Sequence, residues 1–252
     1  MHKLDGVYWD LDGTIANTEL EAHLPAFNNA FNILGIDWYW ENSTYIDLLK
    51  INGGKNRISY FSKLNGDNFS DNFIIDIHRK KQEIYLNLVE DGNVSLKTGV
   101  YRLVTELMSQ NIRQFIVTSS SKVQLNLLLK KLFVDIKPFE SFVTSEDVEF
   151  VKPNPLPYLT AMEISGIKRR NSLVFEDSIP GFKASKAAQL PTICVQSNIP
   201  GNFTTEINID CLIDTLGDEN TSTKIIKGPK LTYKYINLEY LNNYLNIEKK
   251  IT

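Results

Sequence analysis

Short apolar segments alternate with amphipathic segments over most of the chain. The apolar segments are rich in β-branched residues, as is typical of strands that are covered on both faces. They are Leu4–Asp10, Gln114–Thr118, Ser141–Thr144, Ser172–Glu176, Pro191–Val195 and Ile209–Ile213. Helical periodicity lies between them, at Val100–Gln110, Val123–Phe133, Leu156–Ile164 and Phe182–Leu190. This alternation predicts an α/β fold in which a parallel sheet carries helices on both sides.

Residues 18–92 interrupt the alternation with helical patterns only. These patterns lie near Glu19–Leu34, Thr44–Ile51, Asn56–Leu64 and Asn72–Val89. Because a crossover between strands rarely needs so many residues, we expect a separate helical domain at 18–92, inserted into a core formed by 1–17 and 93–252. The alternative is a set of ordinary helices that cover the sheet. The polar tail from Leu216 ends in an amphipathic segment at Tyr235–Leu245.

Composition narrows the class of protein. The 252 residues are 42% hydrophobic and 23% charged, which is typical of a globular protein. The net charge of −3 comes without a basic stripe, so we expect no nucleic-acid partner. No apolar run approaches the roughly 18 residues of a membrane span, and the N-terminus does not read as a targeting peptide. Cys194 and Cys211 lie in apolar runs, as free thiols do in a reducing compartment, so we expect a cytoplasmic protein. We also expect a monomer that does not bind membranes.

Two carboxylates, Asp10 and Asp12, end the first predicted strand, and Gly13 then permits a sharp turn. In an extended segment, residues i and i+2 project to the same side. Ligands of parallel α/β sheets bind beyond the carboxyl ends of the strands. Two acids there can hold a hard divalent cation or act as nucleophile and acid/base. Alone, this pattern also fits a plain turn.

Three later segments add polar groups at similar places. Thr118, Ser119 and Ser120 close the second core strand, where they can hold an anion, although Ser and Thr are also ordinary helix caps. Lys152 stands in a proline-bounded turn before a helix and, taken alone, reads as a surface lysine. Glu176 and Asp177 end another apolar strand as a second acidic pair, which suits metal coordination.

In this order, the segments resemble the four motifs of the haloacid dehalogenase superfamily of phosphohydrolases. The matching residues are Asp10 and Asp12 in the first motif, Thr118 or Ser119 in the second, Lys152 in the third, and Glu176 with Asp177 in the fourth. The helical block matches the helical cap of that superfamily, so the resemblance covers nearly the whole chain. It implies a Rossmann-like core with an inserted all-helical cap.

The resemblance also implies a phosphatase that works through an aspartyl-phosphate. Asp10 would attack phosphorus, and Asp12 would protonate the leaving alkoxide and then activate water. Lys152 and Ser119 would contact the phosphoryl oxygens. The dehalogenase branch needs no acid/base at the position of Asp12, so this residue favours phosphate chemistry.

The cofactor that the resemblance implies is Mg²⁺. Its ligands would be Asp10, the backbone carbonyl of Asp12 and Asp177, while Glu176 would be a direct ligand or would support one. The cation would neutralise phosphoryl oxygens and keep the Asp10 carboxylate ionised.

The helical block resembles the cap of the CbbY-type sugar-phosphate phosphatases. The likeness lies in Thr18–His23 with Ala26–Asn28, in Leu48–Lys50 with Gly53–Ile58, and in His78–Lys81. It implies removal of phosphate from xylulose 1,5-bisphosphate. The sequence departs from the pattern of that group at Asn17, Leu24–Pro25 and Asn56, and none of these positions belongs to the four core motifs.

The residues of the cap themselves support an anion site. Gly53 and Gly54 free the backbone to wrap a ligand, and Lys55 and Arg57 supply positive charge. Arg57 could bind a phosphate bidentately, and Thr118 and Ser120 could hold the other phosphate in the core. A small phosphorylated sugar with two phosphates therefore suits the chain.

The helical pattern at Asn72–Val89 ranks its basic residues. Lys81 falls within the apolar face and His78 falls on its edge, whereas Arg79 and Lys80 point away. A lysine in an apolar face is costly unless an anion or carboxylate meets it, so Lys81 and His78 are the expected ligand contacts. The alternative is a lysine that snorkels at the rim of the face.

Two residues of the first cap helix remain open between two roles. His23 could orient a sugar hydroxyl or be an ordinary helix histidine. Glu19 could accept hydrogen bonds from sugar hydroxyls or stabilise the first turn of its helix.

Three other functions compete with the sugar phosphatase. A β-phosphoglucomutase-like enzyme would share the fold, Mg²⁺ and both aspartates, but would release little phosphate. A phosphoglycolate phosphatase would leave the Gly53–Arg57 cluster with little to bind. A non-catalytic binding protein on this scaffold would be expected to lack acidic or basic residues of the core motifs, and all of these are present.

Overall fold

The computed structural model describes residues 3–51, 53–197, 203 and 209–248. The chain divides into two compact units, which we call the core (Met1–Ala16 with Leu96–Thr252) and the cap (Asn17–Ser95). The boundaries expected from the sequence, at 17/18 and 92/93, lie within three residues of these divisions.

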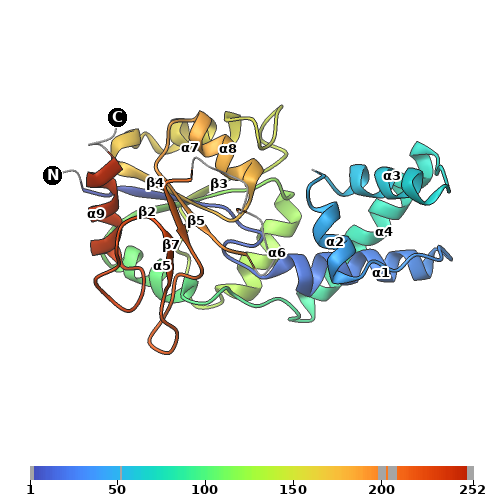
Figure 1. Cartoon of the computed structure of the whole chain (residues 1–252), viewed down its shortest axis with the longest axis horizontal. Coiled ribbons are helices and arrows are strands. Elements are labelled where there is room, and N and C mark those ends of the chain that lie inside the picture. Colours follow the sequence, from blue (N-terminus) through green and yellow to red (C-terminus); the bar gives the residue numbers. More distant parts are fainter. Residues whose placement is uncertain (1–2, 52, 198–202, 204–208, 249–252) are drawn as a thin grey trace. The chain divides into compact units, whose positions relative to one another are not determined.

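The core is built on a seven-stranded sheet (Figure 1). Its strands are β1 (Gly6–Trp9), β2 (Arg113–Val117), β3 (Ser141–Val143), β4 (Ser172–Glu176), β5 (Thr192–Val195), β6 (Cys211–Ile213) and β7 (Ile225–Lys227). The spatial order is β3-β2-β1-β4-β5-β6-β7, and every neighbouring pair is parallel except the antiparallel pair β6–β7. The predicted parallel α/β sheet is thus confirmed, whereas the sequence pattern did not predict β7.

Helices cover both faces of the sheet. They are α5 (Val100–Ser109), α6 (Lys122–Leu132), α7 (Leu156–Ser165), α8 (Ile179–Ala187), α9 (Leu238–Glu248) and the short 3₁₀ turn η2 (Arg169–Asn171). The Tyr8 hydroxyl bonds to Ser165 of α7 at 2.6 Å. The next residue, Trp9, donates to Gln114, whose amide donates to the Val104 carbonyl in α5. Since successive strand residues point to opposite faces, α7 and α5 lie on opposite sides, with α8 beside α7 and α9 beside α5.

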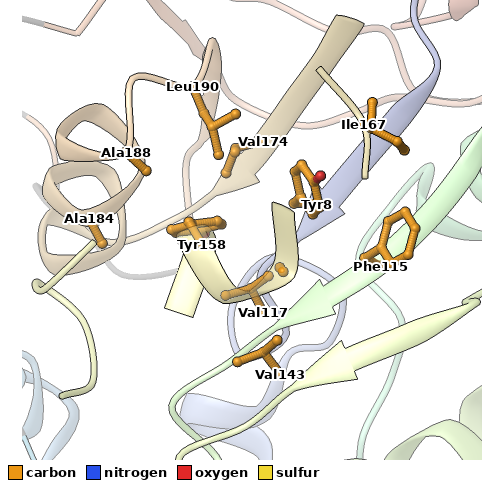
Figure 2. Packing of buried hydrophobic residues seen from close by; sticks show 11 residues of the cluster. Tyr8, Phe115, Val117, Val143, Tyr158, Ile167, Val174, Ala184, Ala188 and Leu190 are labelled. Atoms are coloured by element: carbon orange, nitrogen blue, oxygen red, sulfur yellow. The ribbon is translucent and has the colours of Figure 1, made fainter. Parts of the chain in front are cut away.

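Figure 2 shows the apolar layer between the sheet and the helices α7 and α8. Side chains from neighbouring strands meet helix side chains in this layer. Its largest members are Tyr8, Phe115 and Tyr158, joined by Val117, Val143, Val174 and Leu190. This packing fixes the strands whose carboxyl ends carry the predicted chemistry.

Helix α8 begins three residues before the expected start at Phe182. Ser178 caps it by accepting the backbone N–H of Gly181 at 3.1 Å. Pro180 fits the first helical turn, where its missing N–H costs nothing. Pro180 and Gly181 therefore lie inside the helix, and the sequence pattern predicted its start too late.

Within its described residues, the cap has helices and no strand, as predicted. It contains the π-helical turn η1 (Glu19–His23), α1 (Leu24–Ile33), α2 (Asn42–Leu48), α3 (Gly54–Asn65) and α4 (Asp71–Glu90). Its interior is strongly aromatic and is formed by Phe27, Phe31, Trp38, Trp40 and Tyr45, with Leu24, Leu48, Ile58, Ile74 and Ile77. The cap therefore has a hydrophobic core of its own, and the alternative of ordinary sheet-covering helices is excluded.

The predicted single helix Glu19–Leu34 is divided into a π-helical turn and an α-helix. In η1, the N–H of Leu24 reaches back five residues to the Glu19 carbonyl. Pro25 follows directly and has no N–H to donate to an α-helical bond. A wider turn before proline satisfies the backbone, and such π turns are frequent at functional sites.

Candidate active site

Two adjacent strand ends bring three carboxylates together. Asp10 follows β1, while Glu176 ends β4 and Asp177 follows it. The pairing continues past the strands, because the N–H of Asp10 donates to the Phe175 carbonyl at 3.0 Å. All three acids are buried, and one oxygen from each lies within 4.8 Å of the others. Such a set of oxygen donors fits a hard divalent cation.

Two glycines make room for these acids. A Cβ at Gly13, whose φ is +86°, would lie 2.0 Å from Asp177 Oδ2. A Cβ at Gly181 would lie 1.9 Å from Glu176 Oε2. The carboxylates of Glu176 and Asp177 thus pack directly on glycine. We call this packing the cradle, and such close placement of the carboxylates is consistent with a cation site.

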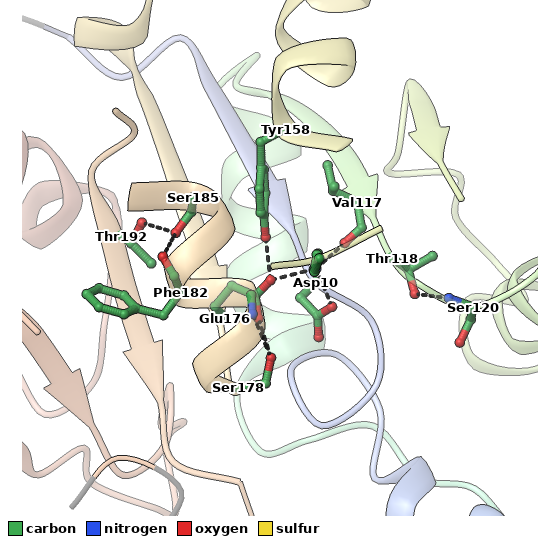
Figure 3. A network of polar contacts seen from close by, with 12 residues as sticks. Asp10, Val117, Thr118, Ser120, Tyr158, Glu176, Ser178, Phe182, Ser185 and Thr192 are labelled. Carbon is green, nitrogen blue, oxygen red and sulfur yellow. Dashed lines mark hydrogen bonds and ion pairs between the residues drawn. The ribbon is translucent and has the colours of Figure 1, made fainter. Parts of the chain in front are cut away.

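Lys152 brings a positive charge to this group, and Figure 3 shows the polar contacts around Asp10 and Glu176. Its ammonium donates to Asp10 Oδ1 at 2.7 Å, to Glu176 Oε1 at 2.6 Å and to the Val117 carbonyl at 2.7 Å. Burial alone would lower the pKa of Lys152, but the charges of Asp10 and Glu176 outweigh it and hold the pKa above its ordinary value. Burial and the neighbouring Glu176 raise the pKa of Asp10 to about 7, against the opposing effect of Lys152. The structure therefore joins the first, third and fourth motifs in one ion network.

The network includes Tyr158, which the sequence analysis did not single out. Tyr158 is the third residue of α7 and is completely buried. Its hydroxyl donates to Glu176 Oε1 at 2.5 Å, and Lys152 Nζ lies 5.1 Å from its ring centroid. Burial, followed by the charge of Glu176, raises its pKa well above 10, so the hydroxyl remains a donor. A buried tyrosine in the first turn after Lys152 reads as a core residue in the sequence.

Asp12 has a separate partner. Ser120 Oγ donates to Asp12 Oδ2 at 2.5 Å. Thr118 is buried and its Oγ1 accepts the N–H of Ser120 at 3.0 Å, whereas Ser119 is exposed. The Asp12 carboxylate is not part of the group formed by Asp10, Glu176 and Asp177. That the backbone carbonyl of Asp12 binds a metal stays a prediction.

A second lysine near the acids was also missed. Lys97 is buried, and its ammonium donates to the Gln196 carbonyl at 3.1 Å. Burial lowers its pKa, while the charge of Asp177 acts in the opposite direction. Its place in a loop gave no periodicity from which burial could be predicted.

In the cap, Lys81 is buried as expected for a lysine in the apolar face of α4. It is 3% exposed, which excludes snorkelling at the rim. Its ammonium lies 2.6 Å from His23 Nδ1 and stands over the rings of Phe27 and Tyr85, at 5.0 Å and 4.9 Å. An ammonium group only donates, so a neutral His23 would accept at Nδ1 and offer its N–H at Nε2. His23 therefore contacts Lys81 within the cap, and its role toward a sugar hydroxyl stays a prediction.

The Gly-rich segment of the cap packs against His78. Gly53 has a φ of +88°, and Gly54 begins α3, where a Cβ would lie 2.8 Å from His78 Nε2. Burial, then the charges of Lys81 and of Lys55, lower the pKa of His78 to about 4. The charge of Arg57 acts in the same sense, so this part of the cap is strongly positive.

Glu19 and Arg57 meet the same tyrosine. Tyr45 donates to Glu19 Oε2 at 2.5 Å, and the Arg57 guanidinium carbon lies 5.9 Å from the Tyr45 ring centroid. Arg57 Nε donates to the Ile51 carbonyl at 3.0 Å. By contrast, Arg79 pairs with an aspartate and Lys80 with a glutamate on the outer side of α4. The ligand roles assigned to the cap residues remain predictions.

Comparison with known proteins decides the family. Residues 7–195 match the profile of the haloacid dehalogenase-like hydrolases. The chain belongs to this family. The CbbY protein of Rhodobacter capsulatus is 34% identical over 199 residues, which cover 77% of this chain and 86% of that protein. The CbbY protein of Cereibacter sphaeroides is 32% identical over 203 residues, 80% of this chain and 86% of that protein.

Solved structures agree with this membership. A CbbY variant from Rhodobacter sphaeroides in complex with xylulose-(1,5)bisphosphate is 29% identical, with a TM-score of 0.73 over 84% of this chain and 94% of that chain. A β-phosphoglucomutase from Clostridium difficile is 18% identical, with a TM-score of 0.74 over 99% of this chain and 100% of that chain, and shows a shared fold. The resemblance to CbbY-type haloacid dehalogenase enzymes is confirmed, and the enzyme class is that of a phosphoric monoester hydrolase. Within the described residues, helices fall short of the length and apolarity that crossing a membrane requires.

Proposed function

We propose that this protein is a Mg²⁺-dependent sugar-phosphate phosphatase, that it works through an aspartyl-phosphate on Asp10, and that its substrate is xylulose 1,5-bisphosphate. The observation that carries the proposal is the buried group of Asp10, Glu176 and Asp177 beside the ammonium of Lys152. The similarity to a CbbY protein in complex with xylulose-(1,5)bisphosphate supports this choice of sugar.

Each core residue has a distinct role in the proposed reaction. The Asp10 carboxylate attacks phosphorus, and Lys152 stabilises the charge of the phosphoryl oxygens. Asp12 protonates the leaving sugar oxygen and later takes a proton from the attacking water. Ser119 and the backbone around it bind phosphoryl oxygens.

The acidic group would hold Mg²⁺ through Asp10, Asp177 and the Asp12 carbonyl, with Glu176 as a further ligand or support. When bound, the cation would neutralise phosphoryl oxygens and favour the ionised form of Asp10. Lys152 pairs with Asp10 and Glu176, and the grouping of three buried carboxylates within 4.8 Å of one another supports a divalent cation there.

The cap is proposed to recognise the rest of the substrate. Lys81, His78 and Arg57 supply positive charge, and the glycines beside them admit a ligand close to the backbone. His23 offers an Nε2 donor to a sugar hydroxyl, and Glu19 offers acceptors. The two buried free thiols fit a reducing compartment, and from them we infer a cytoplasmic enzyme. That it works as a monomer is a separate proposal.

The test is the release of phosphate from four candidate substrates with and without Mg²⁺. These are xylulose 1,5-bisphosphate, ribulose 1,5-bisphosphate, β-glucose 1-phosphate and phosphoglycolate. A clear preference in kcat/KM for the xylulose ester, lost in Asp10→Asn, is the expected result. Equal rates on all four, or conversion of the glucose ester without phosphate release, would overturn the substrate and favour a mutase in the second case.

A further inference from the structure

We propose that Tyr158 is a positioning residue for the cation site, and that its hydroxyl holds the Glu176 carboxylate in place when Lys152 turns to the substrate. The inference rests on the proposed function, since it assigns Glu176 to that site. It adds a residue that acts on the site without touching the substrate.

The two donors to Glu176 Oε1 come from one short segment. Lys152 and Tyr158 are six residues apart, on either side of the start of α7 at Leu156, and both donate to Glu176 Oε1, at 2.6 Å and 2.5 Å. The other oxygen, Oε2, lies against Gly181 and accepts a longer bond from Ser178 Oγ at 3.3 Å. Figure 3 shows the tyrosine hydroxyl pointing at the glutamate. The orientation of Glu176 is therefore determined chiefly at Oε1.

The two donors differ in what else they serve. Lys152 also donates to Asp10 and to the Val117 carbonyl, so its three N–H groups are shared. In the proposed reaction Asp10 gains a phosphoryl group, whose oxygens then compete for the same ammonium. Within the part of the chain that the structure describes, the hydrogen bond of the Tyr158 hydroxyl is the one to Glu176. This hydroxyl is the donor that stays on Glu176 while the charge at Asp10 changes.

The tyrosine is also held rigidly. Its ring is completely buried in the apolar layer between the sheet and the helices α7 and α8 (Figure 2). A side chain fixed by packing can orient a buried carboxylate, and hydrogen bonds to metal ligands typically affect metal affinity or activity about 10- to 100-fold.

Tyr158→Phe removes the hydroxyl while keeping the ring, and the same layer supplies a matched control. Tyr8 also lies in it, is completely buried, and uses its hydroxyl to bond Ser165 at 2.6 Å. Tyr8→Phe therefore deletes a buried hydroxyl of the same kind that does not touch Glu176.

Mg²⁺ binding by calorimetry without substrate and the Mg²⁺ dependence of phosphate release are measured for both variants. Tyr158→Phe is expected to weaken Mg²⁺ binding and raise the half-saturating Mg²⁺ concentration by about tenfold or more. Tyr8→Phe is expected to stay within about twofold in both. The rise in Tm that Mg²⁺ induces gives a second binding readout if either variant is less stable.

The outcomes separate the inference from the function on which it rests. In one outcome, the unaltered protein binds Mg²⁺ and hydrolyses its substrate while Tyr158→Phe keeps the Mg²⁺ affinity and the half-saturating Mg²⁺ concentration within twofold of the unaltered values. That result overturns the positioning role and leaves the proposed function standing. Equal losses in Tyr158→Phe and Tyr8→Phe would also overturn it, because they would show a general effect of core hydroxyls. If the unaltered protein neither binds Mg²⁺ nor releases phosphate, the proposed function fails first.

Discussion

At the scale of single residues, the core site consists of buried charges that satisfy one another. Glu176 is fully buried, and Lys152 and Asp10 are nearly so, which is tolerated because the ammonium meets both carboxylates. Asp12 differs, because its carboxylate is not a member of the three-acid group and accepts the Ser120 hydroxyl. This separation suits a residue that exchanges protons rather than one that holds a cation.

Asp12→Asn tests the acid/base role directly. The amide can still accept the Ser120 hydrogen bond, so the fold and the Tm should change little, but it cannot transfer a proton. We expect kcat to fall by about 10²- to 10⁴-fold. Phosphate release and a thermal melt measured together check this, and an Asp12→Asn enzyme that turns over normally would refute the assignment.

His78 predicts a pH dependence of stability. Its pKa of about 4 lies below the ordinary value of 6.5, because burial and the lysines around it disfavour the imidazolium. Between these values the unfolded chain binds the proton and the folded chain does not, so acidification from about pH 6.5 to pH 4 destabilises the fold. The slope from this one group is at most about 1.4 kcal/mol per pH unit.

Chemical denaturation of the wild type and of His78→Gln, compared at several pH values, isolates this contribution. The difference between the two free energies of unfolding should change across that window and be constant below pH 4. A difference that does not vary with pH would contradict the lowered pKa.

The acidic residues of the motifs could be predicted because polar groups at the ends of apolar strands stand out in a sequence. Asp10, Glu176 and Asp177 were recognised in this way, whereas Lys152 was predicted through the family resemblance. Tyr158 and Lys97 could not be, because a tyrosine in a helix reads as core and a loop lysine reads as surface. Their roles depend on contacts with residues distant in the chain.

At the scale of elements, strand ends place the acids and helix starts supply their partners. Most predicted elements were confirmed, with ends that shift by a few residues. The start of α8 was predicted too late, because Pro180–Gly181 resembles a turn. In the structure Ser178 caps the helix and Pro180 lies in its first turn. Gly181 lies in the same turn, where the Glu176 carboxylate leaves no room for a Cβ. The π turn at Glu19–His23 was missed because helical periodicity does not distinguish five-residue from four-residue hydrogen bonds.

Gly181→Ala separates helix propensity from site geometry. In an unconstrained helix, Ala in place of Gly stabilises by about 1 kcal/mol. Here the added Cβ would lie 1.9 Å from Glu176 Oε2, so we expect a lower Tm together with weaker Mg²⁺ binding. A variant with a raised Tm and unchanged Mg²⁺ binding would contradict the cradle described for Glu176.

At the scale of the whole molecule, two units with separate hydrophobic cores have different proposed roles: the core carries out catalysis and the cap recognises the substrate. The cap is one continuous insertion, and the strands and acids belong to the core. The inserted domain could be predicted, because 18–92 lacks strand patterns. The strand β7 could not, since three residues at a sheet edge leave little periodicity.

Lys81→Met tests whether the cap binds the substrate, and Lys80→Met on the same helix is its control. Lys81 is buried beside His23, whereas Lys80 pairs with Glu83 on the outer side. We expect Lys81→Met to lower kcat/KM for the bisphosphate by about tenfold or more, equivalent to one charge-assisted hydrogen bond of about 1.5–3 kcal/mol. Lys80→Met should leave it unchanged, and equal effects of the two would refute a binding role for Lys81.

The central claim is that Asp10 carries the phosphoryl group, and rapid acid quenching during a single turnover tests it most directly. With Mg²⁺ and xylulose 1,5-bisphosphate, mass spectrometry should find phosphate on the peptide that contains Asp10. The phosphorylated peptide should appear before inorganic phosphate and should decay as inorganic phosphate accumulates. Asp10→Asn should give neither the phosphorylated peptide nor inorganic phosphate. Full phosphate release without a phosphorylated Asp10, or from Asp10→Asn, would contradict the account.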